Sequence, residues 1–202
     1  YLKVCEDFPN LDIRFGMEVG YQKHVCSEQE AIIHSREFDF IVNSVHIVDG
    51  LDIYIKDYYA PGMQAQRYKR YLELIYESVC APVTYSVVGH MGYVARISTY
   101  NKKDIAYSDF PELIDAILEK VIRTGHGIEL NTRVFETYPL PSLDIIRRYR
   151  EKGGDIITLG SDAHKPADVG RQFIEAAEAL RDIGFKYTCR YEKMQPIFEK
   201  LP

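Results

Sequence analysis

The sequence contains no tryptophan and only four cysteines among its 202 residues. Cys5, Cys26, Cys80 and Cys189 are scattered along the chain, and no two of them form a CxxC pair. A zinc site built on cysteines is therefore not expected, because such sites use closely spaced thiolates. We interpret all four as reduced thiols, which is typical of cytoplasmic proteins.

Long apolar runs are also missing. No stretch approaches the ~18 consecutive apolar residues that indicate a membrane-spanning helix, so we expect no membrane segment. No signal peptide is visible at the N-terminus. The chain opens with Tyr1 in place of Met, and we therefore expect it to begin partway through a longer gene product.

Positive charge is not in excess. The chain has 25 Lys and Arg against 30 Asp and Glu, which gives a net charge of −5. Proteins that bind nucleic acid usually cluster Lys and Arg, so we expect no nucleic-acid partner. A small anionic substrate is compatible with this balance, because a few arginines or metal ions can bind it locally. With 46% hydrophobic residues, the chain can bury a core as one domain spanning residues 1–202.

Strand-like and helix-like segments alternate along the chain. Predicted strands lie at 12–19, 38–45, 85–88, 127–130, 155–159 and 185–189, and predicted helices at 27–35, 63–79, 113–122, 142–152 and 169–180. Ser27 and Glu30 resemble a capping box at the start of the first helix. This alternation predicts an α/β fold with a parallel sheet covered by helices. A doubly wound sheet and a barrel both fit the pattern.

Polar side chains follow these apolar strands at the point where each strand ends. The residues in question are Glu18, His46, His90, Asn131, and Asp162 with His164. In (β/α) barrels the C-terminal ends of the strands carry the active site, because the loops there converge. Imidazole nitrogen and carboxylate oxygen are suitable ligands for Zn, Mn and Fe ions. A carboxylate such as Glu18 can bridge two metals, which together can bind a phosphoryl group and activate a water.

Each of these residues also has an ordinary structural interpretation. A single His after a strand is more often a hydrogen-bonded core or loop residue, and Asp162 could cap a helix. Their joint occurrence at four strand ends favours a metal centre. We interpret His34 and His126 as surface residues, and His24 stays open.

Five segments carry a resemblance to a known family. They are GMEVGY around Glu18, NSVH ending at His46, VVGHMGYVAR around His90, ELNTR from Glu129 to Arg133, and TLGSDAH ending at His164. In this order they resemble the motifs of the PHP (polymerase and histidinol phosphatase) family. The YVAR and ELNTR segments point to its histidinol-phosphatase branch. The resemblance runs from about Asp12 to about Phe185.

The resemblance implies a fold and a metal site. Family members form a distorted seven-stranded (β/α) barrel, similar to a TIM barrel, with up to three metal ions at its C-terminal mouth. We accordingly expect two or three divalent ions, of Zn, Mn or Fe. By resemblance, Glu18 bridges two metals and His46 and His90 complete one site. Asp162 serves a second metal and His164 a third.

The resemblance also implies an activity. The reaction is the hydrolysis of a small phosphorylated substrate, L-histidinol phosphate, to L-histidinol and phosphate in histidine biosynthesis. Asp162 and His164 are the predicted catalytic residues, and the identity of the general acid stays open. Arg96, Arg133 and Asn131 are the predicted substrate-binding residues. The two arginines are chosen because the paired N–H donors of a guanidinium group match two oxygens of a phosphate.

The sequence departs from the family pattern at its beginning. The HxH motif of the first strand and a further His after the second are missing, so we expect the first one or two βα units to be absent. Two alternatives to a histidinol phosphatase follow. One is a PHP phosphoesterase with a different substrate, and the other is a catalytically inactive PHP-like binding or scaffold domain.

Overall fold

A parallel sheet of five strands forms the centre of the computed structural model, which describes residues 1–201. Its strands are β1 (Gly16–Gly20), β2 (Phe40–Ser44), β5 (Val87–Val88), β6 (Gly127–Asn131) and β7 (Ile157–Gly160). The order across the sheet is β1-β2-β5-β6-β7, and every neighbouring pair is parallel. Because spatial order follows chain order, successive strands bring their C-terminal ends side by side, and the predicted α/β architecture with a parallel sheet is confirmed.

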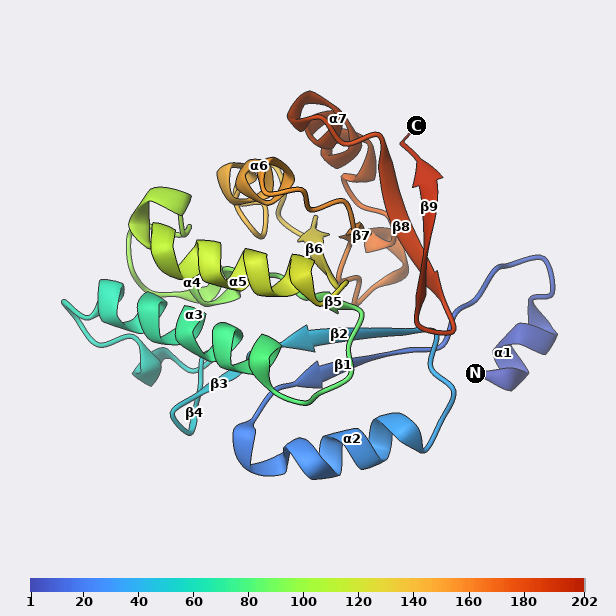
Figure 1. Ribbon diagram of the computed structural model, residues 1–202, viewed down its shortest axis with the longest axis horizontal. Coiled ribbons are helices and arrows are strands. Elements are labelled where there is room, and N and C mark those ends of the chain that lie inside the picture. The colour runs from blue at the N-terminus through green and yellow to red at the C-terminus, as the bar shows by residue number, and fades with distance from the viewer. Residues whose placement is uncertain (202) are drawn as a thin grey trace.

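Helices connect and cover these strands (Figure 1). The helices are α1 (Leu2–Asp7), α2 (Cys26–His34), α3 (Gln64–Cys80), α4 (Tyr93–Ile97), α5 (Pro111–Arg123), α6 (Leu143–Glu151) and α7 (Phe173–Ile183). Figure 1 shows α3 and α5 running side by side, with α6 and α7 next to them and α2 at the opposite end of the sheet. Among residues 1–201, no helix is long and apolar enough to cross a membrane.

Two antiparallel hairpins complete the fold. The small one joins β3 (Ile47–Val48) to β4 (Leu51–Asp52), directly after β2. The larger one joins β8 (Tyr187–Glu192) to β9 (Gln195–Lys200) and lies next to β7. The small hairpin is important for the site, because it follows His46 immediately.

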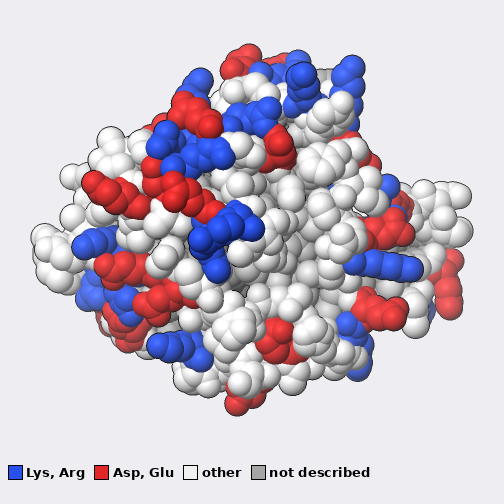
Figure 2. Space-filling model, in the orientation of Figure 1, with Lys and Arg blue, Asp and Glu red and all other residues white. Residues whose placement is uncertain are grey.

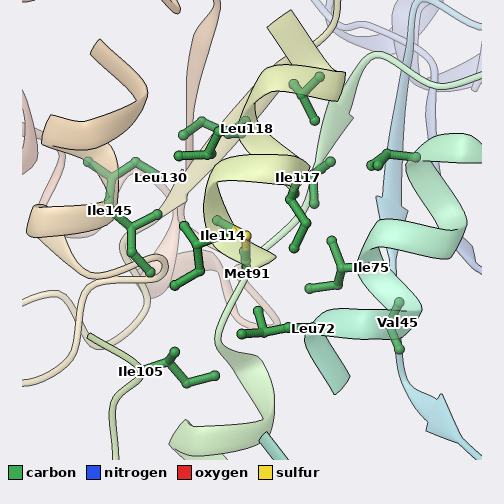
Figure 3. Close-up of a cluster of buried hydrophobic side chains, with 14 of the residues drawn as sticks. Val45, Leu72, Ile75, Met91, Ile105, Ile114, Ile117, Leu118, Leu130 and Ile145 are labelled. Atoms are coloured by element: carbon green, nitrogen blue, oxygen red, sulfur yellow. The ribbon is translucent and has the colours of Figure 1, made fainter. Parts of the chain in front are cut away.

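The core lies between the sheet and the α3–α5 pair (Figure 3). Leu72 and Ile75 of α3 face Ile114, Ile117 and Leu118 of α5, and all five side chains are at most 1% exposed. Their spacing of three or four residues places each set on one helix face. Each such burial stabilises the fold by about 1.5–3 kcal/mol. This packing fixes the strands, and therefore the residues at their ends.

Acidic and basic side chains are intermixed on the face drawn in Figure 2. Ion pairs on the helices account for part of this pattern. Arg148 of α6 pairs with Asp115 of α5 at 2.7 Å, and Lys152 pairs with Asp115 at 2.9 Å and with Glu119 at 2.6 Å. These contacts tie α5 to α6 along their outer surfaces.

Several local predictions were wrong. Helix α2 has no capping box, because Glu30 turns away to accept hydrogen bonds from the backbone N–H and the hydroxyl of Thr84. Val169 is 73% exposed and precedes α7 instead of belonging to its buried face. The segment after His90, for which no helix was predicted, contains the short helix α4. The last predicted strand, 185–189, is present as β8 and pairs with β9.

Candidate metal centre and phosphate pocket

A pocket of about 720 Å³ opens at the C-terminal ends of the parallel strands. It is lined by Glu18, His46, Asp52, Tyr54, His90, Tyr93, Arg96, Ile97, Arg133, Val134, Asp162 and His164. Most of the predicted site residues therefore share one cavity. They come from separate βα units, and the order of the sheet brings them together.

Three of these residues form a cluster of potential metal ligands: Glu18, His46 and His90. Oε1 of Glu18 lies 2.9 Å from Nε2 of His90 and 3.3 Å from Nε2 of His46, and the two imidazole nitrogens are 3.4 Å apart. A tetrahedral ion with bonds of about 2.0–2.1 Å needs donor atoms about 3.3 Å apart. The observed spacing therefore fits a single divalent ion of the zinc type.

The electrostatics of the cluster suit a cation. Hydrogen bonds from His46, and then from His90, hold the pKa of the Glu18 carboxyl far below its usual range. The carboxylate is therefore ionised at neutral pH and offers a negative charge beside two imidazoles. Neutral imidazole and ionised carboxylate are the forms in which these side chains bind metal.

The position of His90 depends on an unusual backbone turn. Its φ is +23°, and the residue before it, Gly89, could not carry a side chain. A Cβ at position 89 would overlap Cγ1 of Val42 and lie 2.7 Å from Oγ of Ser44. The backbone N–H of His90 donates a hydrogen bond of 2.8 Å to Oε2 of Glu129. The tight turn directs the buried imidazole toward Glu18.

Two arginines lie on the other side of the pocket, around Asp162. Nη1 of Arg133 is 3.2 Å from Oδ2 of Asp162 and 2.7 Å from Nδ1 of His164, and Nη2 of Arg96 is 3.6 Å from the same Oδ2. The guanidinium of Arg96 also stacks 4.5 Å above the ring of Tyr93. Tyr93 in turn contacts the rings of His46 and His90, with centroids 5.6 and 4.9 Å away. The cationic region is thus packed directly against the imidazoles.

The predicted role of Asn131 in substrate binding stays a prediction. Asn131 is 1% exposed and does not line the pocket. Its amide oxygen accepts a hydrogen bond of 3.2 Å from the backbone N–H of Arg133 and lies 3.5 Å from Nη1 of Arg96. Asn131 therefore contacts both arginine residues without lining the pocket.

Asp162 and His164 line the pocket but do not belong to the three-ligand cluster. Their described partners are the arginines, and their assignment as metal ligands stays a prediction. The remaining histidines lie outside the pocket. His24 is exposed, and His34 is exposed and pairs with Glu30.

His126, which we interpret as a surface residue, is partly exposed. Its ring is half-buried and stacks on Tyr85, with centroids 4.0 Å apart, and burial lowers its pKa. The stacking partner comes from the segment before β5, which no local pattern indicated.

Sequence reasoning missed three residues of the site: Asp52, Tyr54 and Glu129. Asp52 and Tyr54 come from the β3–β4 hairpin and its exit, where the sequence shows only a polar stretch. Glu129 left a usable signal, because it is a charged residue inside a continuously buried strand. Such a residue is rare without a specific reason.

Comparison with known proteins agrees with this geometry. The sequence model of the PHP domain matches residues 1–133. A probable histidinol-phosphatase of Clostridium acetobutylicum is 25% identical over 188 residues, covering 92% of this chain and 74% of that protein. The histidinol-phosphatase of Lactococcus lactis is 27% identical, covering 92% of this chain and 70% of the relative. A probable histidinol-phosphatase of Deinococcus radiodurans is 29% identical, again covering 92% of this chain.

A solved structure shows the same fold. The crystal structure of histidinol phosphate phosphatase from Lactococcus lactis, complexed with zinc, L-histidinol and phosphate, superposes with a TM-score of 0.85. It is 24% identical and covers 97% of this chain and 76% of the other. The fold, the pocket and the family match together define a metal-dependent phosphoesterase class, and the chain belongs to the PHP family. Its relatives named above are histidinol-phosphatases.

Proposed function

We propose that this protein hydrolyses a phosphate monoester, L-histidinol phosphate, to L-histidinol and phosphate. The observation that carries the proposal is the pairing, in one pocket, of a three-donor cluster with two arginines. The three-donor cluster can hold a divalent cation, and the two arginines can bind a phosphate. The curated relatives that cover most of the chain are histidinol-phosphatases, which supports the choice of substrate.

Glu18, His46 and His90 would hold a divalent ion, of Zn, Mn or Fe. Such an ion would supply Lewis-acid polarisation of the phosphoryl group and activation of a water. Asp162 and His164 are the proposed ligands for a second and a third ion. Both side chains point into the pocket that the cluster faces, which is the reason for keeping them in the proposal.

Arg96 and Arg133 would bind the non-bridging oxygens of the phosphoryl group. Each guanidinium presents paired N–H donors that match two phosphate oxygens and counter the charge that develops on them. Asp162, which both arginines contact, and Asn131, which lies beneath them, hold the guanidinium groups toward the same space. On substrate binding, Arg96 and Arg133 would give up their contacts with Asp162 and bind the phosphate instead.

Hydrolysis forms a bond between the attacking water oxygen and phosphorus and breaks the bond to the ester oxygen. The leaving alkoxide needs a proton, and the water must lose one. Asp162 and His164 are the ionisable groups beside the arginines, and we assign the proton transfers to this pair. Which of the two donates to the alkoxide is decided by the pH profiles of Asp162→Asn and His164→Gln.

The other end of the substrate would face the β3–β4 hairpin. Histidinol carries an amino group and an imidazole, both of which can be cationic. Asp52 lines the pocket, and no Lys, Arg or His within residues 1–201 forms an ion pair with it. Its Oδ1 accepts a hydrogen bond of 2.8 Å from the backbone of Tyr54, whose side chain is 73% exposed. We propose that Asp52 and Tyr54 bind this cationic end.

The test is a comparison of substrates with added Zn²⁺ or Mn²⁺. The protein should hydrolyse histidinol phosphate with a kcat/KM at least ten times that for glycerol phosphate or p-nitrophenyl phosphate. Equal rates on all three would favour a different PHP phosphoesterase. Bound metal without hydrolysis of any of them would favour a binding or scaffold role.

A further inference from the structure

Glu129 places a carboxyl group beneath the metal centre, although it does not line the pocket. It lies on β6, between β5 and β7, and is 9% exposed. No Lys, Arg or His of the described chain forms an ion pair with it. Burial raises its pKa, as expected for a carboxyl group without a cationic partner. Because burying such a group is unfavourable, its presence calls for a specific role.

A glycine on the neighbouring strand β7 makes room for this carboxyl group. A Cβ at Gly160 on β7 would overlap Oε1 of Glu129. A Cβ at Gly89, at the end of β5, would lie 3.7 Å from Oε2 and would overlap Val42. A methyl group at position 160 would therefore close the slot that the carboxyl group occupies, whereas one at position 89 would make only ordinary contact with it.

The contact that Glu129 makes from this slot is with the backbone of His90. Its Oε2 accepts the N–H of that residue at 2.8 Å. His90 has a φ of +23°, a conformation that side-chain-bearing residues rarely adopt and that needs support from its surroundings. The same residue directs Nε2 to within 2.9 Å of Glu18 and 3.4 Å of His46.

We propose that Glu129 is a positioning residue of the metal centre, whose carboxyl oxygen anchors the backbone of His90 and thereby aims its imidazole at the ion held with Glu18 and His46. The role rests on the metal centre of the proposed function but not on the identity of the substrate. Residues that orient metal ligands typically change metal affinity about 10–100-fold when they are lost.

The experiment measures the binding of Co²⁺, whose visible spectrum reports the number and geometry of its ligands, and needs no substrate. Glu129→Leu fills the slot but removes the acceptor. Glu129→Gln keeps an acceptor oxygen in a side chain of the same shape. Ser78→Ala is the control, because Ser78 is also buried and hydrogen-bonded, to Asn43, but lies outside the pocket.

We expect Glu129→Leu to weaken Co²⁺ binding about 10–100-fold and to alter the spectrum. Glu129→Gln should recover most of the affinity, and Ser78→Ala should bind Co²⁺ like the original protein. Unchanged binding by folded Glu129→Leu would overturn the proposal, and so would equal losses in the Leu and Gln variants. If Glu129→Leu does not fold, Gly160→Ala is measured instead, since its methyl group displaces the carboxyl group of Glu129. A similar loss of Co²⁺ affinity in Gly160→Ala supports the proposed role of Glu129, and unchanged Co²⁺ affinity refutes it.

These outcomes are separate from those for the proposed function. If the protein binds Co²⁺ with the expected variant pattern but does not hydrolyse histidinol phosphate, the role of Glu129 stands and the proposed substrate is wrong. If the protein binds no Co²⁺, both the proposed metal centre and the role of Glu129 are wrong.

Discussion

Oε1 of Glu18 lies 2.9 Å from Nε2 of His90, although 72 positions separate the two residues in the sequence. Glu18 is on β1 and His90 follows β5, and β2 lies between these two strands in the sheet. His46, two residues after β2, is likewise a donor, at 3.3 Å from the same oxygen. Three successive strands of the sheet thus contribute one ligand each.

Removal of either imidazole should abolish tight metal binding. His46→Ala and His90→Ala each leave two donors, and since loss of a residue that only orients a ligand costs 10–100-fold, loss of a ligand should weaken zinc binding by more than about 100-fold. Equilibrium dialysis with elemental analysis measures this directly. His34→Ala is the matched control, because His34 is exposed and remote from the pocket. Equal zinc content in all variants would rule out this site.

Replacement of the arginines should weaken phosphate binding. Arg96→Lys and Arg133→Lys keep the charge but lose the paired donors, and a hydrogen bond to a charged group contributes about 1.5–3 kcal/mol, or roughly 10–100-fold. Inhibition by inorganic phosphate gives the affinity without relying on substrate identity. Arg123→Lys, on the exposed side of α5, should have no effect. If Arg96→Lys and Arg133→Lys bind phosphate as tightly as Arg123→Lys does, these two arginines are not the phosphate-binding residues.

Asp52→Asn should change substrate preference more than catalysis. Loss of the carboxylate charge removes the proposed partner of the cationic end of histidinol phosphate, so its KM should rise about 10-fold or more. The KM for p-nitrophenyl phosphate, which has no such end, should stay the same. Parallel assays of the two substrates make the comparison. A similar rise in both KM values would show that Asp52 acts on the phosphate end or on the fold.

The ion pair between α5 and α6 should make stability depend on pH. Arg148, and then Lys152, lower the pKa of Asp115 to about 2 in the folded protein. A folded pKa below the unfolded value of about 3.9 means that the pair stabilises the fold above pH 4 and that this stabilisation is lost as pH falls toward 2. Asp115→Asn should therefore lower the free energy of unfolding by about 1 kcal/mol at pH 7.

Urea unfolding at a series of pH values tests this. The difference between Asp115→Asn and the original protein should shrink as pH falls from 4 to 2. Asp57→Asn serves as the control, since Asp57 is exposed and forms no ion pair with the residues described. A difference that stays constant over that range would mean that Asp115 stabilises the helices through something other than its charge.

The ligand cluster could be predicted because its members lie in or just after apolar strands: Glu18 is inside β1, and His46 and His90 come two residues after β2 and β5, respectively. Glu18, His46 and His90 stand at places where a parallel sheet presents its C-terminal edge, and that edge is common to all strands. The role of Asn131 could not be predicted in the same way. Side chains alternate along a strand, so Asn131 shares a face with Glu129, and that face lies beneath the pocket.

The sequence by itself determined which residues end the strands, because the alternation of apolar runs with polar residues is a local property of the chain. Only the tertiary structure decided which of these residues meet. Donor distances depend on strand order and register, and the helix packing of α3 on α5 holds both in place. For the same reason the role of Glu129 became visible only in three dimensions, since Gly160 on β7 opens its slot and its hydrogen-bond donor is the backbone of His90, after β5.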